Sequence, residues 1–342
     1  MNTLPHAKIV IFEVEDWERE AFSSLFRSNE HHVHFVKDPL TDDNVSEYGD
    51  ANIIAPFIYS ALNRDVLSQF DDLKLICTRS TGYDHIDLDY CRDHGIAVAN
   101  VPAYGDNTVA EHVFGLLLSI SHNLPTAIYK TRMGDFSQQN LQGFDLRKKT
   151  LGVIGTGSIG QHVIRIAKGF DMEVAAYDVK PDKALADKLD FCYCAFEEVL
   201  VGADIITLHV PALPETRNLI SDREFAIMRD GVVLINTARG EIVDNQALLQ
   251  ALANGKVSAA GLDVLPEEPT IREEAELVRS VFHKEHNLDT LLVNHILLRM
   301  NNVYITPHSG FNTREAFQRI IETTAENITS FLEGDLKNQV NI

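Results

Sequence analysis

Three polar side chains in the second half of the chain each follow a short apolar run that predicts a buried strand: Arg239, Glu268 and His308. Ligands of open parallel α/β sheets bind beyond the carboxyl ends of the strands, so these are candidate catalytic residues. Arginine is a planar, permanent cation that can hold a carboxylate with two hydrogen bonds. Histidine can donate a proton near neutral pH, and a neighbouring carboxylate favours its protonated form. Each residue alone also fits a capping, turn or ordinary polar role, but three of them facing one cleft indicate catalysis.

A glycine-rich turn in the middle of the chain is typical of a dinucleotide site. The segment Gly155–Gly160 follows an apolar run and opens a helical pattern. Gly155 would make the tight turn, Gly157 would let the backbone approach a pyrophosphate, and Gly160 would let the helix pack closely on the strand. The helix N-terminus would supply N–H groups for the phosphates. Asp178 ends the next apolar run, where its carboxylate would accept hydrogen bonds from a ribose and repel a 2′-phosphate, which predicts NAD rather than NADP.

Short apolar runs alternate with helical patterns along the whole chain, which predicts an α/β fold with parallel sheets covered on both faces. Before residue 103 the runs are Ile9–Phe12, Val33–Val36, Ile53–Ala55, Leu75–Cys77 and Ala97–Ala99. After it they are Leu151–Ile154, Val174–Tyr177, Ile205–Leu208, Val232–Ile235, Ala259–Leu262 and Val303–Thr306. We expect two doubly wound parallel-sheet domains with a cleft between them. A Rossmann NAD-binding domain, residues 104–307, would be inserted into a flavodoxin-like substrate domain, residues 1–103 and 308–342.

Two helices are predicted beside these strands. The stretch Asp106–His122 has apolar positions on more than one face, so it must be buried in its own domain or against another copy of the chain. Thr313–Leu332 predicts a C-terminal helix that returns to the first domain. Residues 267–302 are less regular, with an acidic helix at Ile271–Phe282, and we interpret them as an insertion of unassigned purpose.

Composition narrows the class of protein. The chain has 342 residues, 45% of them hydrophobic, which is enough for about two packed cores. Its formal net charge of −20 disfavours nucleic acid and anionic membranes as partners. No apolar stretch is long enough to cross a bilayer, so we expect a cytoplasmic protein. The cysteines show neither C-x-x-C spacing nor a histidine at zinc-ligand distance, so we expect free thiols and no metal site. They are Cys77, Cys91, Cys192 and Cys194.

Several motifs occur in the order seen in one enzyme family. They are the segment Gly155–Gly160 with Asp178, Leu208–Thr216, Asn236–Gly240, Gly261–Val264 and Thr306–His308. With them the chain resembles the D-isomer-specific 2-hydroxyacid dehydrogenases over nearly its whole length. The segments Arg79–Asp87 and Val101–Tyr104, and the long gap between Glu268 and His308, look most like the D-lactate dehydrogenase branch. Pro266, Pro269 and the segment Ser309–Asn312 depart from that branch's pattern.

The resemblance implies a role for each matching residue. Arg239 would hold the substrate carboxylate and polarise the ketone, His308 would give the proton, and Glu268 would favour the protonated imidazole. The Thr81 and Gly82 N–H groups would receive the carboxylate, and Tyr104 would close the pocket. Further positions would contact NAD, in addition to the three glycines, Asp178 and Arg239: Ser158, Ile159, His209, Val210, Pro211, Thr216, Thr237, Ala238 and Asp263.

The leading hypothesis is an NAD-dependent D-2-hydroxyacid dehydrogenase that transfers a hydride between NADH and a small 2-oxo acid, with pyruvate and D-lactate as the first pair to test. The family's dimer is built through the segment that corresponds to 106–122, so a homodimer is expected. The alternative is an NAD(H)-sensing binding protein, because transcriptional corepressors share this fold. Turnover of 2-oxo acids would distinguish the two.

Overall fold

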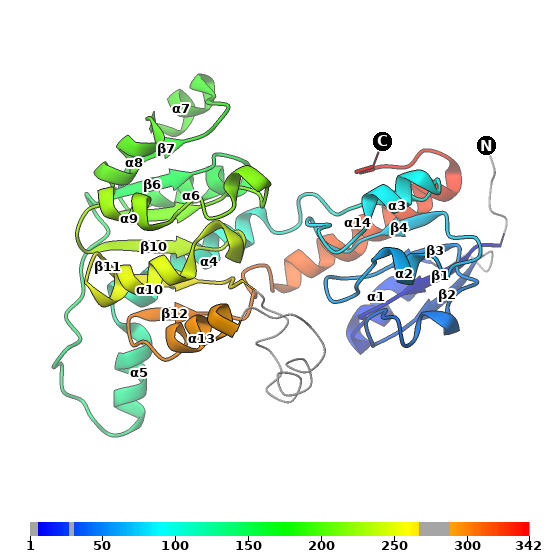
Figure 1. Ribbon diagram of the computed structural model, residues 1–342, viewed down its shortest axis with the longest axis horizontal. Coiled ribbons are helices and arrows are strands. Elements are labelled where there is room, and N and C mark those ends of the chain that lie inside the picture. The colour runs from blue at the N-terminus through cyan, green and yellow to red at the C-terminus, as the bar shows by residue number, and fades with distance from the viewer. Residues whose placement is uncertain (1–5, 27–30, 267–287, 342) are drawn as a thin grey trace. The chain divides into compact units, whose positions relative to one another are not determined.

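Two parallel sheets, each with helices on both faces, make up the chain (Figure 1). The structure is a computed structural model that describes residues 6–26, 31–266 and 288–341. The chain divides into one unit of Met1–Tyr104 with Thr313–Ile342 and another of Gly105–Asn312. The chain passes from one unit to the other after Tyr104 and again after Asn312, whereas the sequence analysis placed these boundaries after residues 103 and 307. As a result Tyr104 lies in the first unit, and His308 lies in the second.

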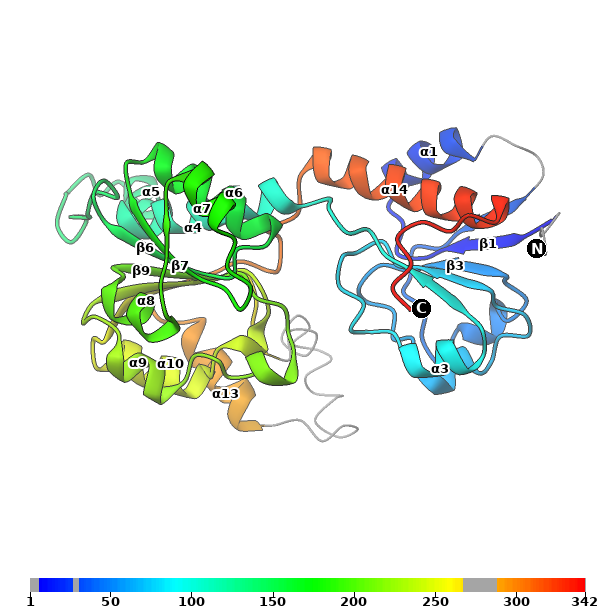
Figure 2. The ribbon, with the colours of Figure 1, turned by 90° about the horizontal axis from the view of Figure 1, so that it is seen from above.

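The first unit is built on a five-stranded parallel sheet of order β2-β1-β3-β4-β5. Its strands are β1 (Lys8–Ile11), β2 (His32–Phe35), β3 (Ile53–Ala55), β4 (Leu75–Cys77) and β5 (Ala97–Ala99). Its helices are α1 (Asp16–Leu25), α2 (Arg64–Leu67), α3 (Leu88–Asp93) and α14 (Arg314–Glu333), with a 3₁₀ turn at Val45–Glu47. Figure 2 shows α1 and α14 on one face of the sheet and α3 on the other, where apolar side chains of α2 also join the core. This strand order is the flavodoxin-like one.

The second unit is built on a seven-stranded parallel sheet of order β12-β11-β10-β9-β6-β7-β8. Its strands are β6 (Thr150–Ile154), β7 (Glu173–Tyr177), β8 (Cys192–Tyr193), β9 (Ile205–Leu208), β10 (Val232–Asn236), β11 (Val257–Leu262) and β12 (Val303–Ile305). Its helices are α4 (Asp106–Ser121), α5 (Leu124–Arg132), α6 (Ser158–Gly169), α7 (Lys183–Leu189), α8 (Phe196–Gly202), α9 (Asp222–Ile227), α10 (Asn245–Ala253) and α13 (Leu288–Leu297). Two 3₁₀ turns lie at Pro214–Thr216 and Gly240–Ile242. Side chains of α4 and α6 fill one face of the sheet, and those of α8, α9, α10 and α13 fill the other.

The strands expected from sequence are confirmed within one or two residues at each end. β8 was missed, because two residues at a sheet edge give no periodicity to read. The interpretation of residues 267–302 as irregular was wrong for its last part, since α13 is a regular helix whose buried Leu297 joins the core beside α10. The expected helix Ile271–Phe282 lies outside the described residues.

The long helix α4 is buried inside its own unit. Val113, Leu117 and Ile120 are covered by the sheet and by α6, and Phe114 stacks on Phe170 with ring centroids 5.4 Å apart. The sequence left two explanations for the apolar faces of α4: burial in its own domain or against another copy of the chain. Packing within its own domain is sufficient to explain them. No helix in the described part of the chain is both long and apolar enough to cross a membrane.

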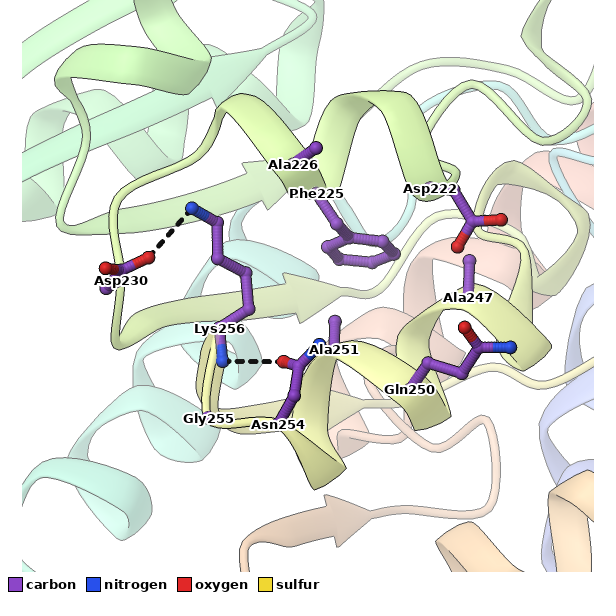
Figure 3. A pocket seen from close by; sticks show the side chains of 10 residues that line it. All are labelled: Asp222, Phe225, Ala226, Asp230, Ala247, Gln250, Ala251, Asn254, Gly255 and Lys256. Carbon is purple, nitrogen blue, oxygen red and sulfur yellow. Dashed lines mark hydrogen bonds and ion pairs between the residues drawn. The ribbon is translucent and has the colours of Figure 1, made fainter.

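A surface pocket lies between α9 and α10 (Figure 3). Its wall includes Asp230, Gly255 and Lys256, and the Lys256 ammonium pairs with the Asp230 carboxylate at 2.8 Å. These residues directly precede β10 and β11. The pocket is therefore at the amino ends of the strands, the edge opposite to the one where parallel α/β sheets bind their ligands.

Candidate active site

The strand order of the second unit reverses between β6 and β9. From β6 the sheet continues to β7 and β8, and from β9 it continues to β10, β11 and β12. The loops that leave two such strands go to opposite faces of the sheet, and this switch point is where doubly wound folds bind dinucleotides. Gly155 directly follows β6, and His209 directly follows β9.

The three glycines meet the demands expected of them. Gly155 has φ of 97°, and a Cβ there would lie 2.5 Å from the His209 carbonyl oxygen, so only glycine fits the switch point. A Cβ on Gly160 would lie 2.2 Å from the Gly155 oxygen, which shows how closely α6 packs on the turn. A Cβ on Gly157 would meet nothing within 4 Å, so this glycine faces open space. Gly157 is also the N-cap of α6, and no side chain caps that helix, so its first N–H groups suit a phosphate.

Asp178 is fixed beside this loop. Its Oδ2 accepts hydrogen bonds from the Thr156 amide at 2.7 Å and the Thr156 hydroxyl at 2.9 Å, and Oδ1 accepts from the Lys180 amide at 2.9 Å. Since Thr156 gives its proton to Asp178, the Tyr193 hydroxyl 2.8 Å away must donate to Thr156. Burial alone would raise the pKa of Asp178, but these hydrogen bonds outweigh it and lower the pKa below its usual value. The carboxylate is therefore charged and held in one orientation.

The loop after β9 carries four of the predicted cofactor contacts: His209, Val210, Pro211 and Thr216. The Thr216 hydroxyl donates to the Pro211 carbonyl at 2.6 Å, which closes the loop on itself. His209 has a ring nitrogen 2.9 Å from the Thr207 hydroxyl, and desolvation lowers the pKa of His209 to about 3. This imidazole is thus neutral at physiological pH and brings no charge to the switch point.

The loop after β10 is shaped by the side chain of Asn236. Its oxygen accepts from the Ala238 amide at 3.0 Å, and its nitrogen donates to the Arg239 carbonyl at 2.9 Å, so one side chain orders the loop. The half-buried Arg239 donates to the Ala238 carbonyl at 2.8 Å. The buried Thr237 hydroxyl has no hydrogen-bond partner within the described part of the chain. A buried hydroxyl without a partner is costly, which fits a position that a ligand satisfies.

The loops after β10 and β11 touch backbone to backbone. A Cβ on Gly240 would lie 2.2 Å from the Leu265 carbonyl carbon, so Gly240 permits this approach. The next residue, Pro266, offers its carbonyl to the side chain of Asn294 on α13 at 2.9 Å. Glu268, the predicted catalytic acid, lies outside the described residues.

His308 follows β12, and its backbone lies in the left-handed region with φ of 52°. Its amide donates to the Asp263 carbonyl at 2.9 Å. Asp263 is 2% exposed, and its carboxylate accepts from the Ser309 and Gly310 amides and from the Thr306 hydroxyl. Asp263 thus holds the segment that carries the candidate proton donor, a role that the sequence did not disclose.

The candidate substrate residues of the first unit follow β4 and β5. The Thr81 hydroxyl donates to the Val101 carbonyl at 2.8 Å, and the Asn100 side chain donates to the Thr81 carbonyl at 2.8 Å. Among the residues that the structure describes, nothing accepts a hydrogen bond from the Thr81 or Gly82 amide. Two adjacent N–H groups left in this way suit an anion. Tyr104 accepts at its carbonyl from the Arg319 guanidinium at 2.7 Å.

In the second unit the structure brings the predicted residues to one edge of the sheet, after β6, β7, β9, β10, β11 and β12. Sequence reasoning missed Thr156 and Tyr193, which fix Asp178, and His112, which faces Asp263 from α4. Thr156 could have been found, since it stands between the first two glycines. His112 gave no such signal, because its partner is about 150 residues away in sequence.

Comparisons with known proteins agree with this geometry. Residues 114–310 match the model of the D-isomer specific 2-hydroxyacid dehydrogenase NAD binding domain. The chain is 31% identical to a D-lactate dehydrogenase of Escherichia coli, over 96% of this chain and 98% of that protein. It is 35% identical to an aromatic 2-oxoacid reductase of Clostridium sporogenes, over 97% and 98%. The structure of a D-lactate dehydrogenase from Aquifex aeolicus, complexed with NAD and lactic acid, superposes with a TM-score of 0.85 at 35% identity, over 98% of this chain and 99% of that one.

The family match covers more than half of the chain, and relatives above 30% identity span almost all of it. The chain therefore belongs to the D-isomer specific 2-hydroxyacid dehydrogenases, and it is an NAD-dependent oxidoreductase of that family.

Proposed function

We propose that this enzyme reduces pyruvate, or a close 2-oxo acid, to the D-2-hydroxy acid with NADH. The observation that carries the proposal is the placement of Arg239 and His308 after β10 and β12, on the same edge of the sheet as the glycine turn and Asp178. A permanent cation and a proton donor beside a dinucleotide site are what reduction of a ketone next to a carboxylate requires.

The residues present fit the cofactor. Gly157 faces open space, and the first N–H groups of α6 have no side-chain cap. The buried Thr237 hydroxyl has no hydrogen-bond partner among the described residues, so it suits a contact with the cofactor. The charged Asp178 suits ribose hydroxyls and opposes a 2′-phosphate. When bound, NADH supplies the hydride that goes to C2 of the 2-oxo acid. We also propose the cytoplasm as the place where the enzyme works, as expected from the sequence.

The chain's own groups supply the rest of the reaction. Arg239 binds the substrate carboxylate and draws electron density toward the ketone oxygen, which makes C2 more electrophilic. As the hydride arrives, His308 gives its proton to that oxygen, so the ketone becomes a hydroxyl and the imidazole becomes neutral. The proposed part of Glu268, which favours the protonated imidazole before the step, rests on the family resemblance.

In the first unit, the family resemblance assigns Thr81, Gly82 and Tyr104 to the substrate. The amides of Thr81 and Gly82, which donate to no other group in the described ranges, would receive one of its carboxylate oxygens. Tyr104 is proposed to close the pocket. The similarity to a structure complexed with lactic acid supports a small substrate.

An aromatic 2-oxo acid is the second candidate. It is favoured by the aromatic 2-oxoacid reductase of Clostridium sporogenes, which is as similar in sequence as the lactate-bound structure. Both candidates use the same polar groups and differ only in the substrate's side chain.

Oxidation of NADH should be measured with pyruvate, 2-oxobutyrate, 2-oxoisocaproate and phenylpyruvate, and the product checked for the D configuration. The highest kcat/KM with pyruvate supports the first candidate, and the highest with phenylpyruvate supports the second. His308→Gln should lower kcat by about 10² to 10⁴, the usual contribution of a general acid. NADH binding without turnover of any 2-oxo acid would leave the binding-protein alternative.

We also propose a homodimer, formed through α5 rather than α4. The apolar side chains of α4 are buried in their own unit, whereas those of α5 and the residues after it are exposed. The exposed ones are Leu124, Ile128, Tyr129, Met133 and Phe136, at 43% to 79%. Exposed apolar groups close together in sequence suit an interaction surface, and α5 follows directly on the helix that the family uses.

A further inference from the structure

The candidate proton donor is carried on a strained segment. His308 has φ of 52°, a backbone region that is unfavourable for most non-glycine residues and persists only where surrounding contacts enforce it. The His308 amide donates to the Thr306 carbonyl at 2.9 Å, and Asp263 supplies contacts on both sides of this amide. Its carbonyl accepts from the His308 amide at 2.9 Å, and its carboxylate accepts from the Ser309 amide at 2.9 Å and the Gly310 amide at 2.8 Å. The orientation of Asp263 therefore contributes to the position of His308.

Two side chains set that orientation. The Thr306 hydroxyl donates to Oδ1 of Asp263 at 2.6 Å. The His112 Nε2 lies 2.9 Å from the Thr306 oxygen and 3.3 Å from the same Asp263 oxygen. Because Thr306 has one hydroxyl proton and gives it to Asp263, it must accept from His112. The proton of His112 is therefore on Nε2.

The fold places His112 at this point through the packing of α4 on β11. His112, Leu116 and Ile120 are four residues apart and form one stripe of the helix. A Cβ on Gly261 of β11 would lie 3.1 Å from Leu116 and 3.4 Å from Ile120, so this glycine lets the helix approach. Asp263 comes two residues later, on the same side of the strand, and meets His112.

The Asp263 carboxyl is buried but stays ionised. Burial by itself would raise its pKa, whereas hydrogen bonds from His112 and Thr306 lower it, and the net result is a pKa below the usual value. A charged carboxylate is the stronger acceptor for the amides of the His308 segment.

We propose that His112 is a positioning residue for the reaction, which holds Asp263 through Thr306 and so keeps His308 where it can protonate the substrate. This inference rests on the proposed function, in which His308 is the proton donor. The family resemblance counts Asp263 among the NAD contacts, but its carboxylate is 2% exposed and accepts from the Thr306 hydroxyl and from the Ser309 and Gly310 amides, so it is directed at the His308 segment. His112 itself touches neither the substrate nor the cofactor in this proposal. Its loss should therefore impair the chemical step and leave cofactor binding unchanged.

The test compares His112→Leu, which removes the donor, with His112→Gln, whose amide nitrogen can donate from nearly the same place. The substrate is the 2-oxo acid that the wild type reduces fastest. His112→Leu should lower kcat by about 10- to 100-fold, since a misplaced catalytic group can cost up to about 10². The dissociation constant for NADH should not change. The deuterium isotope effect on kcat with deuterated NADH should rise, because hydride and proton transfer become the slow steps. His112→Gln should recover most of the rate.

His122→Leu is the matched control, since His122 is exposed at the end of the same helix, and it should keep the wild-type kcat. If His112→Leu does not fold, Thr306→Val and Thr306→Ser form a second pair, in which valine breaks the relay and serine retains it. The inference is overturned if His112→Leu or Thr306→Val keeps the wild-type kcat. It is also overturned if His112→Gln or Thr306→Ser loses as much activity as its partner variant, or if the loss of activity comes with weaker NADH binding. If the wild type reduces no 2-oxo acid, the proposed function is wrong. If the wild type is active and His112→Leu is equally active, only the role of His112 is wrong.

Discussion

Asp178 is proposed to select NADH over NADPH, and the glycine turn that would bind the cofactor also holds this side chain in place. Its carboxylate is bound by Thr156, which stands between the first two glycines, and Thr156 is in turn held by Tyr193. A carboxylate oriented in this way needs no rearrangement to accept the ribose hydroxyls, as the proposed selection of the cofactor requires.

Replacement of Asp178 by alanine tests this selection. We expect the wild type to prefer NADH strongly, and Asp178→Ala to narrow the gap in kcat/KM between NADH and NADPH, because both the hydrogen bonds and the repulsion disappear. Since the pKa of Asp178 is lowered, the carboxylate stays ionised from pH 5.5 to 8, and the wild-type preference should be constant over that range. Asp187→Ala on the exposed side of α7 is the control. Equal kcat/KM for the two cofactors in the wild type would refute the assignment.

Arg239→Lys tests the geometry of the carboxylate contact. Lysine keeps the charge but loses the planar pair of donors. We expect kcat/KM to fall by about two orders of magnitude, as for loss of an oriented donor at an oxygen that gains charge, with NADH binding little changed. Steady-state kinetics and NADH titration measure the two effects separately. Near-wild-type kinetics would mean that the carboxylate binds elsewhere.

At the scale of the element, helix α6 illustrates why position decides what a glycine contributes. Gly160 lies at the start of the helix against the Gly155 carbonyl, whereas a Cβ on Gly169, the last residue of the same helix, would meet nothing within 4 Å. The same substitution at the two ends should therefore have opposite effects.

We expect Gly160→Ala to destabilise the enzyme by about 1–3 kcal/mol, the usual cost of forcing atoms into a packed space. It should also weaken NADH binding, because α6 would move away from the glycine turn. Gly169→Ala should be neutral or raise the stability by up to about 1 kcal/mol, since alanine favours the helix. Chemical denaturation and NADH titration of both variants test this, and similar stabilities would contradict it.

A buried ion pair joins helix α1 to the segment that follows β4. Arg79 and Glu18 are 1% and 2% exposed with their charged atoms 2.6 Å apart, and Arg79 also donates to the Phe12 carbonyl at 2.9 Å. Glu18→Gln would leave the buried arginine without its counter-charge, so we expect a loss of about 3–5 kcal/mol. Glu20→Gln, exposed on the same helix, should leave the melting temperature unchanged. A melting temperature unaffected by Glu18→Gln would show that the pair is not needed.

At the scale of the whole molecule, the apolar side chains of α5 and of the residues after it are exposed in the single chain, which agrees with the proposed dimer. Light scattering at micromolar concentration should give the mass of a dimer. Ile128→Lys places a charge among these exposed apolar side chains and should shift the equilibrium toward monomer. Val201→Lys, at a comparably exposed apolar position on α8, should leave the dimer intact. A monomeric wild type would exclude the proposed assembly.

The sequence by itself determined the α/β class, almost every strand, the position of the glycine turn Gly155–Gly160, and the position of Asp178 after the next strand. These depend on local patterns: apolar runs of strand length, a turn that only glycine can make, and an acid at a strand end. It also singled out Arg239 and His308 through the strands that precede them. Only the tertiary structure decided the burial of α4 in its own unit and the network that joins His112 to Asp263. Those depend on contacts between residues far apart in the chain, which leave no periodic signal because a helix or strand looks the same whichever neighbour covers it.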